Sequence, residues 1–308
     1  MPLPQTGIFA LGTFSHAYLE FELVKDADGK AAVAAAAGLR EPRTTIGGVN
    51  LVSGFRPSLW QKVGKGGTPD SLHGFDKPLI GPDGYTMPAS QHDIVMWLSG
   101  AEYDVVFDLE RDIVAALAPH ARLVHEMVGW PYHHDRDLTG FIDGTENPTL
   151  VEAQSVAIIA GGEAGEGGSV LLLQKWEHDV SAWEELGVTG QERAMGRRKS
   201  DGVELDPLPP ASHVARTDQD DFGDIFRRNI PYGDAAEHGT IFVGFCASQE
   251  PLEAMLRSML GMSPAGGARD ELTRYTQPVT GAYYFIPSTD ALAAVAPSPV
   301  KSGAPDQI

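Results

Sequence analysis

The chain has 308 residues, of which 42% are hydrophobic, and a formal net charge of −19. At about 150 residues per domain, this length predicts two domains or one large one, with room for a buried cofactor cavity. Nucleic acid and anionic membrane surfaces repel so acidic a chain, which argues against both as partners. No apolar run is long enough to cross a bilayer, and residues 1–7 show no secretory pattern, so we expect a cytoplasmic protein.

Cysteine usage limits the kinds of site that the chain can build. The single cysteine, Cys246, excludes an internal disulfide, a multi-cysteine zinc site and an iron–sulfur cluster. Because Cys246 follows the apolar run 241–245, we interpret it as a small buried hydrophobic residue.

The first half of the chain alternates strand and helix patterns. Period-2 alternation and short apolar runs predict strands at 16–23, 50–55, 94–98 and 123–128. Alanine content and helical spacing predict helices at 30–39 and 102–118, and residues 56–87, dense in Gly and Pro, predict a long surface loop. The order strand, helix, strand, strand, helix, strand is the split βαβ arrangement of a ferredoxin-like domain with an antiparallel sheet.

The second half repeats this plan with longer insertions. Apolar runs predict strands at 156–159, 170–173, 240–246 and 281–286. Helical patterns predict helices at 181–196, with breaks at Gly187 and Gly190, and at 252–260. The predicted fold class is therefore α+β, with two tandem ferredoxin-like domains.

The predicted domains are an N-terminal unit at 1–135 and a C-terminal unit at 136–294. A tail at 295–308, rich in Pro, Ala, Ser and Gly, is expected to be disordered. The alternative is a docking peptide that addresses the chain to a larger, encapsulating assembly.

Two groups of basic residues stand out in this acidic chain, at 193–199 and at 216–228. Such clusters suit an anionic ligand, although exposed helix ends explain them equally well. A pair of adjacent histidines, His133 and His134, precedes Asp135 and offers possible metal ligands, but no third or fourth ligand stands at a recognisable offset. A non-haem metal hydrolase built on this cluster is one hypothesis.

The stretch 140–148 reads Gly-Phe-Ile-Asp-Gly-Thr-Glu-Asn-Pro and places one carboxylate, Asp143, on a turn between two glycines. Asp and Gly are also favoured in turns for conformational reasons alone, so an ordinary turn is the alternative to a catalytic site. The downstream sequence is what favours chemistry here.

A series of further motifs follows this turn. They are Trp176-Glu177-His178, Gly196-Arg197-x-Lys199, Ser212-His213, Arg227-x-Asn229-x-Pro231-Tyr232-Gly233, and Arg269-Asp270-x-Leu272 through Gln277-Pro278-Val279-Thr280-Gly281. In order and approximate spacing, these motifs and the turn resemble the dye-decolourising peroxidases, and in particular their compact, bacterial B-type branch. The resemblance spans roughly residues 100 to 290.

This resemblance implies a haem enzyme of tandem ferredoxin-like architecture that holds one haem b per chain in its C-terminal half. Such an enzyme reduces hydrogen peroxide through a ferryl intermediate and oxidises dyes, phenolic compounds or other small one-electron donors. The branch is generally oligomeric, so the resemblance also implies a homo-oligomer.

By the same resemblance, His213 matches the axial ligand of the haem iron, and Asp270 matches the acceptor for the second nitrogen of that imidazole. On the opposite side of the haem, Asp143 matches the acid–base group that moves a proton between the two peroxide oxygens. Arg227 matches the cation that stabilises the departing oxygen, and Asn229 a residue that orders the distal water.

The remaining matches concern the haem edge. Arg197 resembles a partner of a haem propionate, and Arg216 is a weaker candidate for that role. Glu146 resembles a carboxylate near the haem edge, with Gly144 and Thr145 beside it. Two points of register stay open: Arg198 competes with Arg197 for the propionate, and Arg228 competes with Arg227 for the distal position.

A second function from a different class is a protein that binds or traffics haem, or releases its iron, with peroxidase turnover secondary. The two readings differ in what happens on mixing with peroxide, where a carrier stays spectrally inert.

Overall fold

The protein is built around a ring of eight strands. A computed structural model describes residues 2–41, 48–263 and 267–297. In this part of the chain, one sheet has the order β11-β7-β12-β2-β5-β1-β6-β9-β10-β8, and β7 pairs additionally with β10. Because that pairing joins the two ends of the series from β7 to β10, the sheet closes on itself as a barrel.

The first half of the ring comes from the N-terminal repeat. Its strands are β1 (Ser15–Leu23), β2 (Val49–Phe55), β5 (Ile94–Gly100) and β6 (Ala121–Gly129). They are antiparallel in the order β2-β5-β1-β6, and α1 (Gly29–Gly38) and α3 (Tyr103–Leu117) form the crossovers. This order confirms the predicted ferredoxin-like arrangement.

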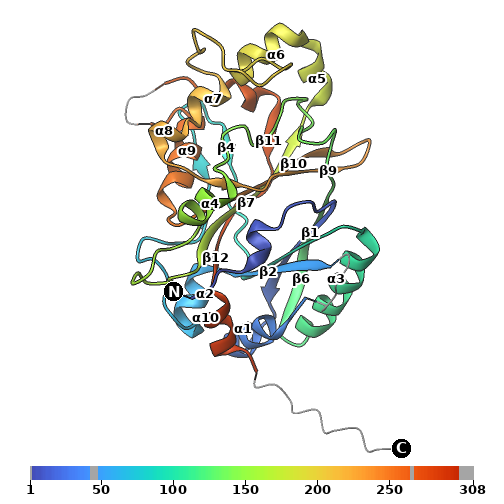
Figure 1. The fold of residues 1–308 in the computed structure, drawn as a ribbon, viewed down its shortest axis with the longest axis vertical. Coiled ribbons are helices and arrows are strands. Elements are labelled where there is room, and N and C mark those ends of the chain that lie inside the picture. Colours follow the sequence, from blue (N-terminus) through green and yellow to red (C-terminus); the bar gives the residue numbers. More distant parts are fainter. Residues whose placement is uncertain (1, 42–47, 264–266, 298–308) are drawn as a thin grey trace, which may run out of the picture.

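The C-terminal repeat supplies the other half. Its strands are β7 (Ser169–His178), β8 (Phe226–Arg227), β9 (Ile230–Gly233), β10 (His238–Cys246), β11 (Thr276–Pro278) and β12 (Ala282–Ile286). Again the pairs are antiparallel, with β7 between β10 and β12, and α9 (Glu250–Met259) lies between β10 and β12 in the chain. Helix α9 lies at the end of the molecule opposite α1 and α3 (Figure 1).

The two repeats meet at two seams, which are narrow. Phe285 of β12 pairs with Phe55 of β2, and Gly129 of β6 pairs with Tyr232 of β9. Apolar side chains from all eight ring strands form one cluster inside the barrel, whereas the opposite strand faces pack against helices in a second cluster. Each strand therefore has one face in the barrel and one face toward its helices, as the period of 2 requires.

One predicted strand is wrong. Residues 156–159 were expected to be extended, but 150–157 form α4 (Leu150–Ala157). The helix begins with a capping box in which Thr149 accepts from the Glu152 backbone N–H and the Glu152 side chain accepts from the Thr149 N–H. A four-residue apolar run does not distinguish strand from helix, and here the cap decides for helix.

The other differences are smaller. The predicted loop 56–87 contains α2 (Pro57–Val63) and the short pair β3 (Leu79–Ile80) and β4 (Thr86–Met87). The predicted helix at 181–196 is divided into α5 (Val180–Glu185) and α6 (Gly187–Met195), so Gly187 is a break and Gly190 is not. Short helical turns complete the fold: η1 (Thr6–Phe9), α7 (His213–Arg216), α8 (Gln219–Phe222) and η2 (Glu271–Arg274).

The last described helix was not predicted by the sequence patterns. This helix, α10 (Thr289–Val295), packs against α1 of the first repeat (Figure 1). Most of the predicted tail, from 298 to 308, lies outside the described residues. Within the described ranges, none of the helices has both the length and the apolar content to span a membrane.

A buried acid lies inside the barrel. Glu20 on β1 is 1% exposed, and its Oε1 accepts a hydrogen bond of 2.6 Å from the Tyr284 hydroxyl of β12. Burial raises the pKa of Glu20 to about 7, although the hydrogen bond from Tyr284 acts in the opposite direction. The folded protein therefore holds a proton that the unfolded chain releases near pH 4.5.

This linkage makes stability depend on pH in a defined direction. Because the folded-state pKa of Glu20 is raised, its contribution to the free energy of unfolding is complete below about pH 4.5. That contribution is lost as the pH rises through about 7. We expect the free energy of unfolding of Glu20→Gln to be close to that of wild type at pH 5. At pH 8 it should exceed the wild-type value by about 2–3 kcal/mol. Urea unfolding midpoints at the two pH values measure the difference. Glu177→Gln, at an exposed position of β7, is the matched control, and an equal response of both variants contradicts the assignment.

Candidate functional site

A large cavity lies between the outer face of the C-terminal sheet and helices α7 and α9. With its open mouth it encloses about 1230 Å³. Much of its wall is apolar, from β7, β10 and α9: Leu172, Trp176, Phe242, Leu252, Met255, Leu256 and Met259. Apolar walls with a few convergent polar groups are typical of a cofactor site.

His213 faces this cavity from α7, the short helix that begins after Ser212. Its Nδ1 lies 2.7 Å from Asp270 Oδ2, and the Asp270 side chain is completely buried. The other oxygen of Asp270 accepts from the Leu272 N–H at the start of η2. Since Nδ1–H donates to Asp270, the lone pair of the neutral imidazole is on Nε2, available to a metal in the cavity.

Two opposing effects set the proton affinity of His213. Burial lowers its pKa, but the charge of Asp270 and the hydrogen bond to it act in the opposite direction and prevail, so the pKa lies above its usual value. Asp270 therefore favours an electron-rich imidazole, which is the property of a strong iron ligand.

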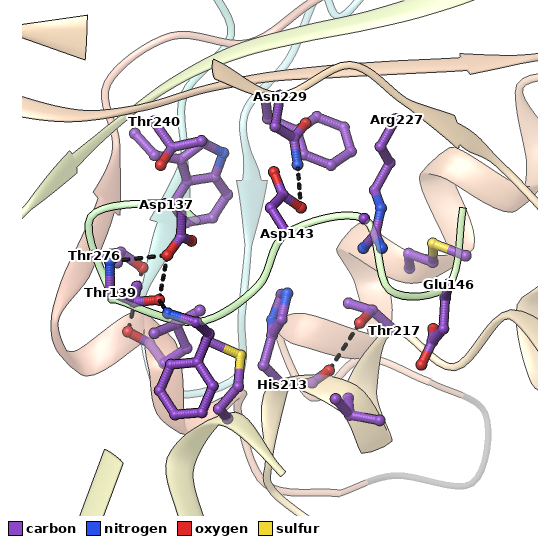
Figure 2. A pocket seen from close by; sticks show the side chains of 18 of the residues that line it. Asp137, Thr139, Asp143, Glu146, His213, Thr217, Arg227, Asn229, Thr240 and Thr276 are labelled. Carbon is purple, nitrogen blue, oxygen red and sulfur yellow. Dashed lines mark hydrogen bonds between the residues drawn. The ribbon is translucent and has the colours of Figure 1, made fainter. Parts of the chain in front are cut away.

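Asp143 lies across the cavity from His213 (Figure 2). Its loop folds back on itself: the Asp143 N–H donates to the Asp135 carbonyl at 2.7 Å, and Gly140 and Gly144 have φ of +82° and +78°. Those φ values lie in the left-handed region that glycine adopts without strain. Asn229 Nδ2 lies 3.5 Å from Asp143 Oδ1 and orients the carboxylate toward the cavity.

Arg227 reaches the same cavity from β8. Its backbone is clamped by Asn147, whose side-chain amide donates to the Arg227 carbonyl at 2.9 Å and accepts from the Arg227 N–H at 2.8 Å. Among the described residues, the buried Arg227 Nε has no hydrogen-bond partner. The next residue, Arg228, turns inside the barrel, where its guanidinium lies 5.3 Å from the centre of the Trp97 ring. The register thus favours Arg227 as the cavity residue.

Arg197 lies at the cavity edge, where two carboxylates contact its guanidinium. It forms ion pairs with Glu146 and with Glu204, the latter at 2.7 Å. Arg198 instead pairs with Asp201, away from the cavity lining. Gly144 and Thr145 line the cavity, as Glu146 does.

Arg216 is the predicted site residue that the structure does not bring to the cavity. It is absent from the residues that line the cavity, and its guanidinium lies against Gly267, where an added Cβ would come within 2.4 Å of Nη1. His213, Val214 and Thr217 line the cavity, whereas the Arg216 guanidinium occupies the space beside Gly267, which has no side chain.

Several polar cavity residues were missed by sequence reasoning. Asp137 faces the cavity, and burial followed by the charge of Asp143 raises its pKa to about 6, against the hydrogen bonds from Thr139. Gln174 and Thr240, on β7 and β10, also line it and hold side-chain atoms without partners among the described residues. Their alternate positions along the strands were the signal that could have found them.

A second cavity, which with its open mouth encloses about 660 Å³, meets the first at the distal residues. Both cavities are lined by Asp143, Gly144, Arg227 and Asn229, while Leu11, Tyr132 and His134 line only the second. The distal residues therefore form part of the wall of both cavities.

The adjacent histidines do not form a metal site with acids. In the part of the chain that the structure describes, no group of three or more His, Cys, Asp and Glu side chains comes together in a way that could hold a metal ion. His133 and His134 lie in a tight turn with φ of +41° and +67°, and both are exposed. The hypothesis of a non-haem metal hydrolase has no support here.

The arrangement can hold a flat metal-bearing macrocycle. An imidazole nitrogen on one side of the cavity would hold its metal, apolar side chains supply the walls, and a carboxylate with an arginine lies on the opposite side. The acid–base pair of groups above such a metal is suited to cleaving a small, polar oxidant.

Comparison with known proteins bears on this arrangement directly. The family model described as "Dyp-type peroxidase, C-terminal" matches residues 134–291. A dye-decolourising peroxidase of Mycolicibacterium paratuberculosis is 35% identical over 273 residues, which cover 86% of this chain and 75% of that protein. One of Rhodococcus erythropolis is 35% identical over 260 residues, covering 81% of this chain and 75% of that protein.

Solved structures agree in fold. DyPB from Rhodococcus jostii superposes with a TM-score of 0.83 at 34% identity, covering 94% of this chain and 97% of that one. A putative Dyp-type peroxidase from Shewanella oneidensis gives a TM-score of 0.84 at 28% identity, covering 96% and 99%. Variants of the Rhodococcus jostii protein have been solved in complex with haem. By sequence along most of its length and by fold, the chain belongs to the dye-decolourising peroxidase family.

Proposed function

We propose that the chain is a haem-dependent peroxidase that reduces hydrogen peroxide and oxidises small one-electron donors such as dyes or phenolic compounds. The observation that supports this most is the pair of opposed groups in one cavity, with His213 backed by Asp270 on one side and Asp143 with Arg227 on the other. Bound between them, haem b would supply the redox-active iron.

The proximal residues would hold the cofactor. His213 would offer Nε2 to the iron, because its Nδ1–H is engaged by Asp270 at 2.7 Å. Asp270 is itself fixed by the Leu272 N–H, so the imidazole ring is held in one orientation before any ligand binds.

The distal residues would handle the proton and the charge of peroxide. Asp143 would take a proton from one peroxide oxygen and return it to the other, which requires one carboxylate within reach of both. Arg227 stays protonated and would stabilise the negative charge on the departing oxygen. Asn229 would hold Asp143 in position, since its own Oδ1 is fixed by the Val243 N–H at 3.0 Å.

Arg197 would meet a haem propionate at the cavity edge. In the structure it already pairs with Glu146 and Glu204, so a propionate would join or replace one of these carboxylates. Arg216 stays a weaker candidate, because it does not line the cavity.

The same cavity would also serve a haem carrier, which is the alternative function. The distal set favours the peroxidase, because a carrier needs no acid–base group opposite the axial ligand. Stopped-flow mixing of the haem-loaded protein with peroxide separates them: a rapid change in the haem spectrum supports the peroxidase, and an inert spectrum supports the carrier.

The oligomeric state of the protein is also a proposal. Tyr103 and Phe107 of α3 are 43% and 44% exposed, with ring centres 6.1 Å apart, and a second copy of the chain in a homo-oligomer would cover them. Light scattering after size exclusion tests this. The docking role of the tail and the cytoplasmic location stay predictions.

Removing the axial imidazole should abolish cofactor retention. We expect His213→Ala to be purified without a Soret band and to regain none on titration with haemin, because the variant lacks the Nε2 that the hydrogen bond to Asp270 leaves for the iron. His120→Ala, in the turn between α3 and β6, is the control and should bind haem as wild type does. Full haem retention in His213→Ala would place the ligand elsewhere.

Removing the distal acid should separate binding from chemistry. We expect Asp143→Ala to keep its haem and to react with peroxide between about 10²-fold and 10⁴-fold more slowly, the range that general acid–base groups contribute. Stopped-flow spectra under single-turnover conditions measure the step, with Asp220→Asn on α8 as an exposed-carboxylate control. Wild-type rates in Asp143→Ala would move the acid–base role to Arg227 or to water.

A further inference from the structure

A second carboxyl group shares the cavity with Asp143. Asp137 lies six residues earlier on the same loop, and both side chains line the cavity (Figure 2). The loop is a tight hairpin in which Arg136 pairs with Ile142, and the Asp137 N–H donates to the Phe141 carbonyl at 3.2 Å. This pairing directs the two carboxylates toward the same chamber.

The carboxyl of Asp137 is fixed by hydrogen bonds but forms no ion pair among the described residues. Its Oδ1 accepts from the Thr139 N–H at 2.9 Å and from the Thr139 hydroxyl, which leaves Oδ2 for the cavity. Among the described residues no Lys, Arg or His forms an ion pair with it, and the nearby Lys199 ammonium donates instead to Gln191 at 2.7 Å. A buried carboxyl without a paired cation tends to keep its proton.

The charges around Asp137 explain where it titrates. Burial and then the charge of Asp143 raise its pKa to about 6, while Thr139 and His213 act in the opposite direction. The other titratable or charged groups that face the same cavity or Asp137 are Glu146, His178, Arg197, Lys199 and Arg227. Asp137 thus changes its protonation state in a range where an ordinary Asp is already ionised.

Peroxide chemistry needs such a group. Reduction of one hydrogen peroxide to two waters takes two electrons from the donors and two protons, in addition to the proton that Asp143 moves between the peroxide oxygens. Those two protons must reach a cavity whose walls are largely apolar. The Thr240 hydroxyl, which faces the cavity without a partner among the described residues, offers a hydrogen-bonding site for a water on such a path.

We propose that Asp137 is a second proton-exchanging residue of the cavity, which supplies Asp143 with protons that the reduction of peroxide consumes. This inference rests on the proposed peroxidase function. In each transfer the Asp137 carboxyl loses a proton to Asp143, directly or through water, and regains one from solvent. Asp137 would act through Asp143 and would not touch the peroxide.

The first test needs neither haem nor activity. Apoprotein labelled at the aspartate ¹³Cγ is titrated by NMR, and wild type should show one resonance that titrates near pH 6 and is absent from Asp137→Asn. The Asp143 resonance should shift at that pH in wild type and stay constant there in Asp137→Asn, because the two charges interact. An Asp143 resonance that is identical in both proteins would overturn the proposal.

The second test measures turnover with a saturating one-electron donor against pH in the haem-loaded enzyme, because the two protons are consumed as the donor electrons enter. In wild type the rate should fall as the pH rises through about 6, where Asp137 loses its proton. In Asp137→Asn the rate should be flat across this range and about 10-fold to 100-fold lower at pH 5. Asp220→Asn should reproduce the wild-type profile.

A further variant distinguishes proton supply from a structural role. Thr139→Val keeps the backbone N–H donor and removes the hydroxyl donor. The hydroxyl hydrogen bond lowers the pKa of Asp137 in wild type, so its removal should move the inflection to higher pH. A loop that merely needed Asp137 for shape would lose rate without moving the inflection, and that result would contradict the proposal. Wild type that is inert to peroxide would instead refute the proposed function, whereas an active wild type with an unchanged Asp137→Asn profile refutes this inference alone.

Discussion

The site depends on one charged hydrogen bond between segments that are far apart in the sequence. His213 and Asp270 are separated by 57 positions, and α8, β8, β9, β10 and α9 lie between them in the chain. A completely buried carboxylate is costly unless it is paired, so Asp270 draws the short helix α7 against η2 and fixes the imidazole at the cavity wall. The position of His213 is therefore a consequence of satisfying Asp270.

The alternation of side chains along β8 and the residues after it decides which of them line the cavity wall opposite His213. Arg227 and Asn229 face the cavity, whereas Arg228 between them enters the barrel and lies over Trp97. A shift of one residue in β8 would exchange these faces, so the amide of Asn147, which binds both backbone groups of Arg227, protects the register. The barrel and the cavity are two sides of the same sheet, and each restricts the other.

Much of this arrangement was predictable from the sequence, and the failures have physical causes. Period-2 and helical patterns predicted the order of elements in the first repeat, because those elements have one apolar face each. The strand predicted at 156–159 failed because the apolar run gave no period, while Thr149 and Glu152, which form the capping box, indicated a helix start. The helix α10 was missed because its packing against α1 is a contact between the two ends of the chain.

For the site, the resemblance of motifs supplied what local patterns could not. Nothing in the spacing of His213 and Asp270 shows that they meet, and nothing local separates Arg227 from Arg228. The same limit explains Arg216: its basic neighbourhood matched an anionic ligand, but its guanidinium packs against Gly267, a contact that no local pattern shows. Asp137 was missed because the turn was considered only for what it does to Asp143.

Two buried acids, Glu20 and Asp137, show how the fold separates stability from chemistry. Both keep a proton at a pH where a solvated carboxyl is ionised, and for both burial is the main cause. Glu20 is buried inside the barrel with Tyr284 as its hydrogen-bond partner and lines neither cavity. Asp137 has one oxygen fixed by Thr139 and faces a chamber open to solvent, so its proton can exchange in the folded state. The same desolvation therefore raises both pKa values and links both groups to stability, but only Asp137 faces a chamber in which its proton can serve chemistry.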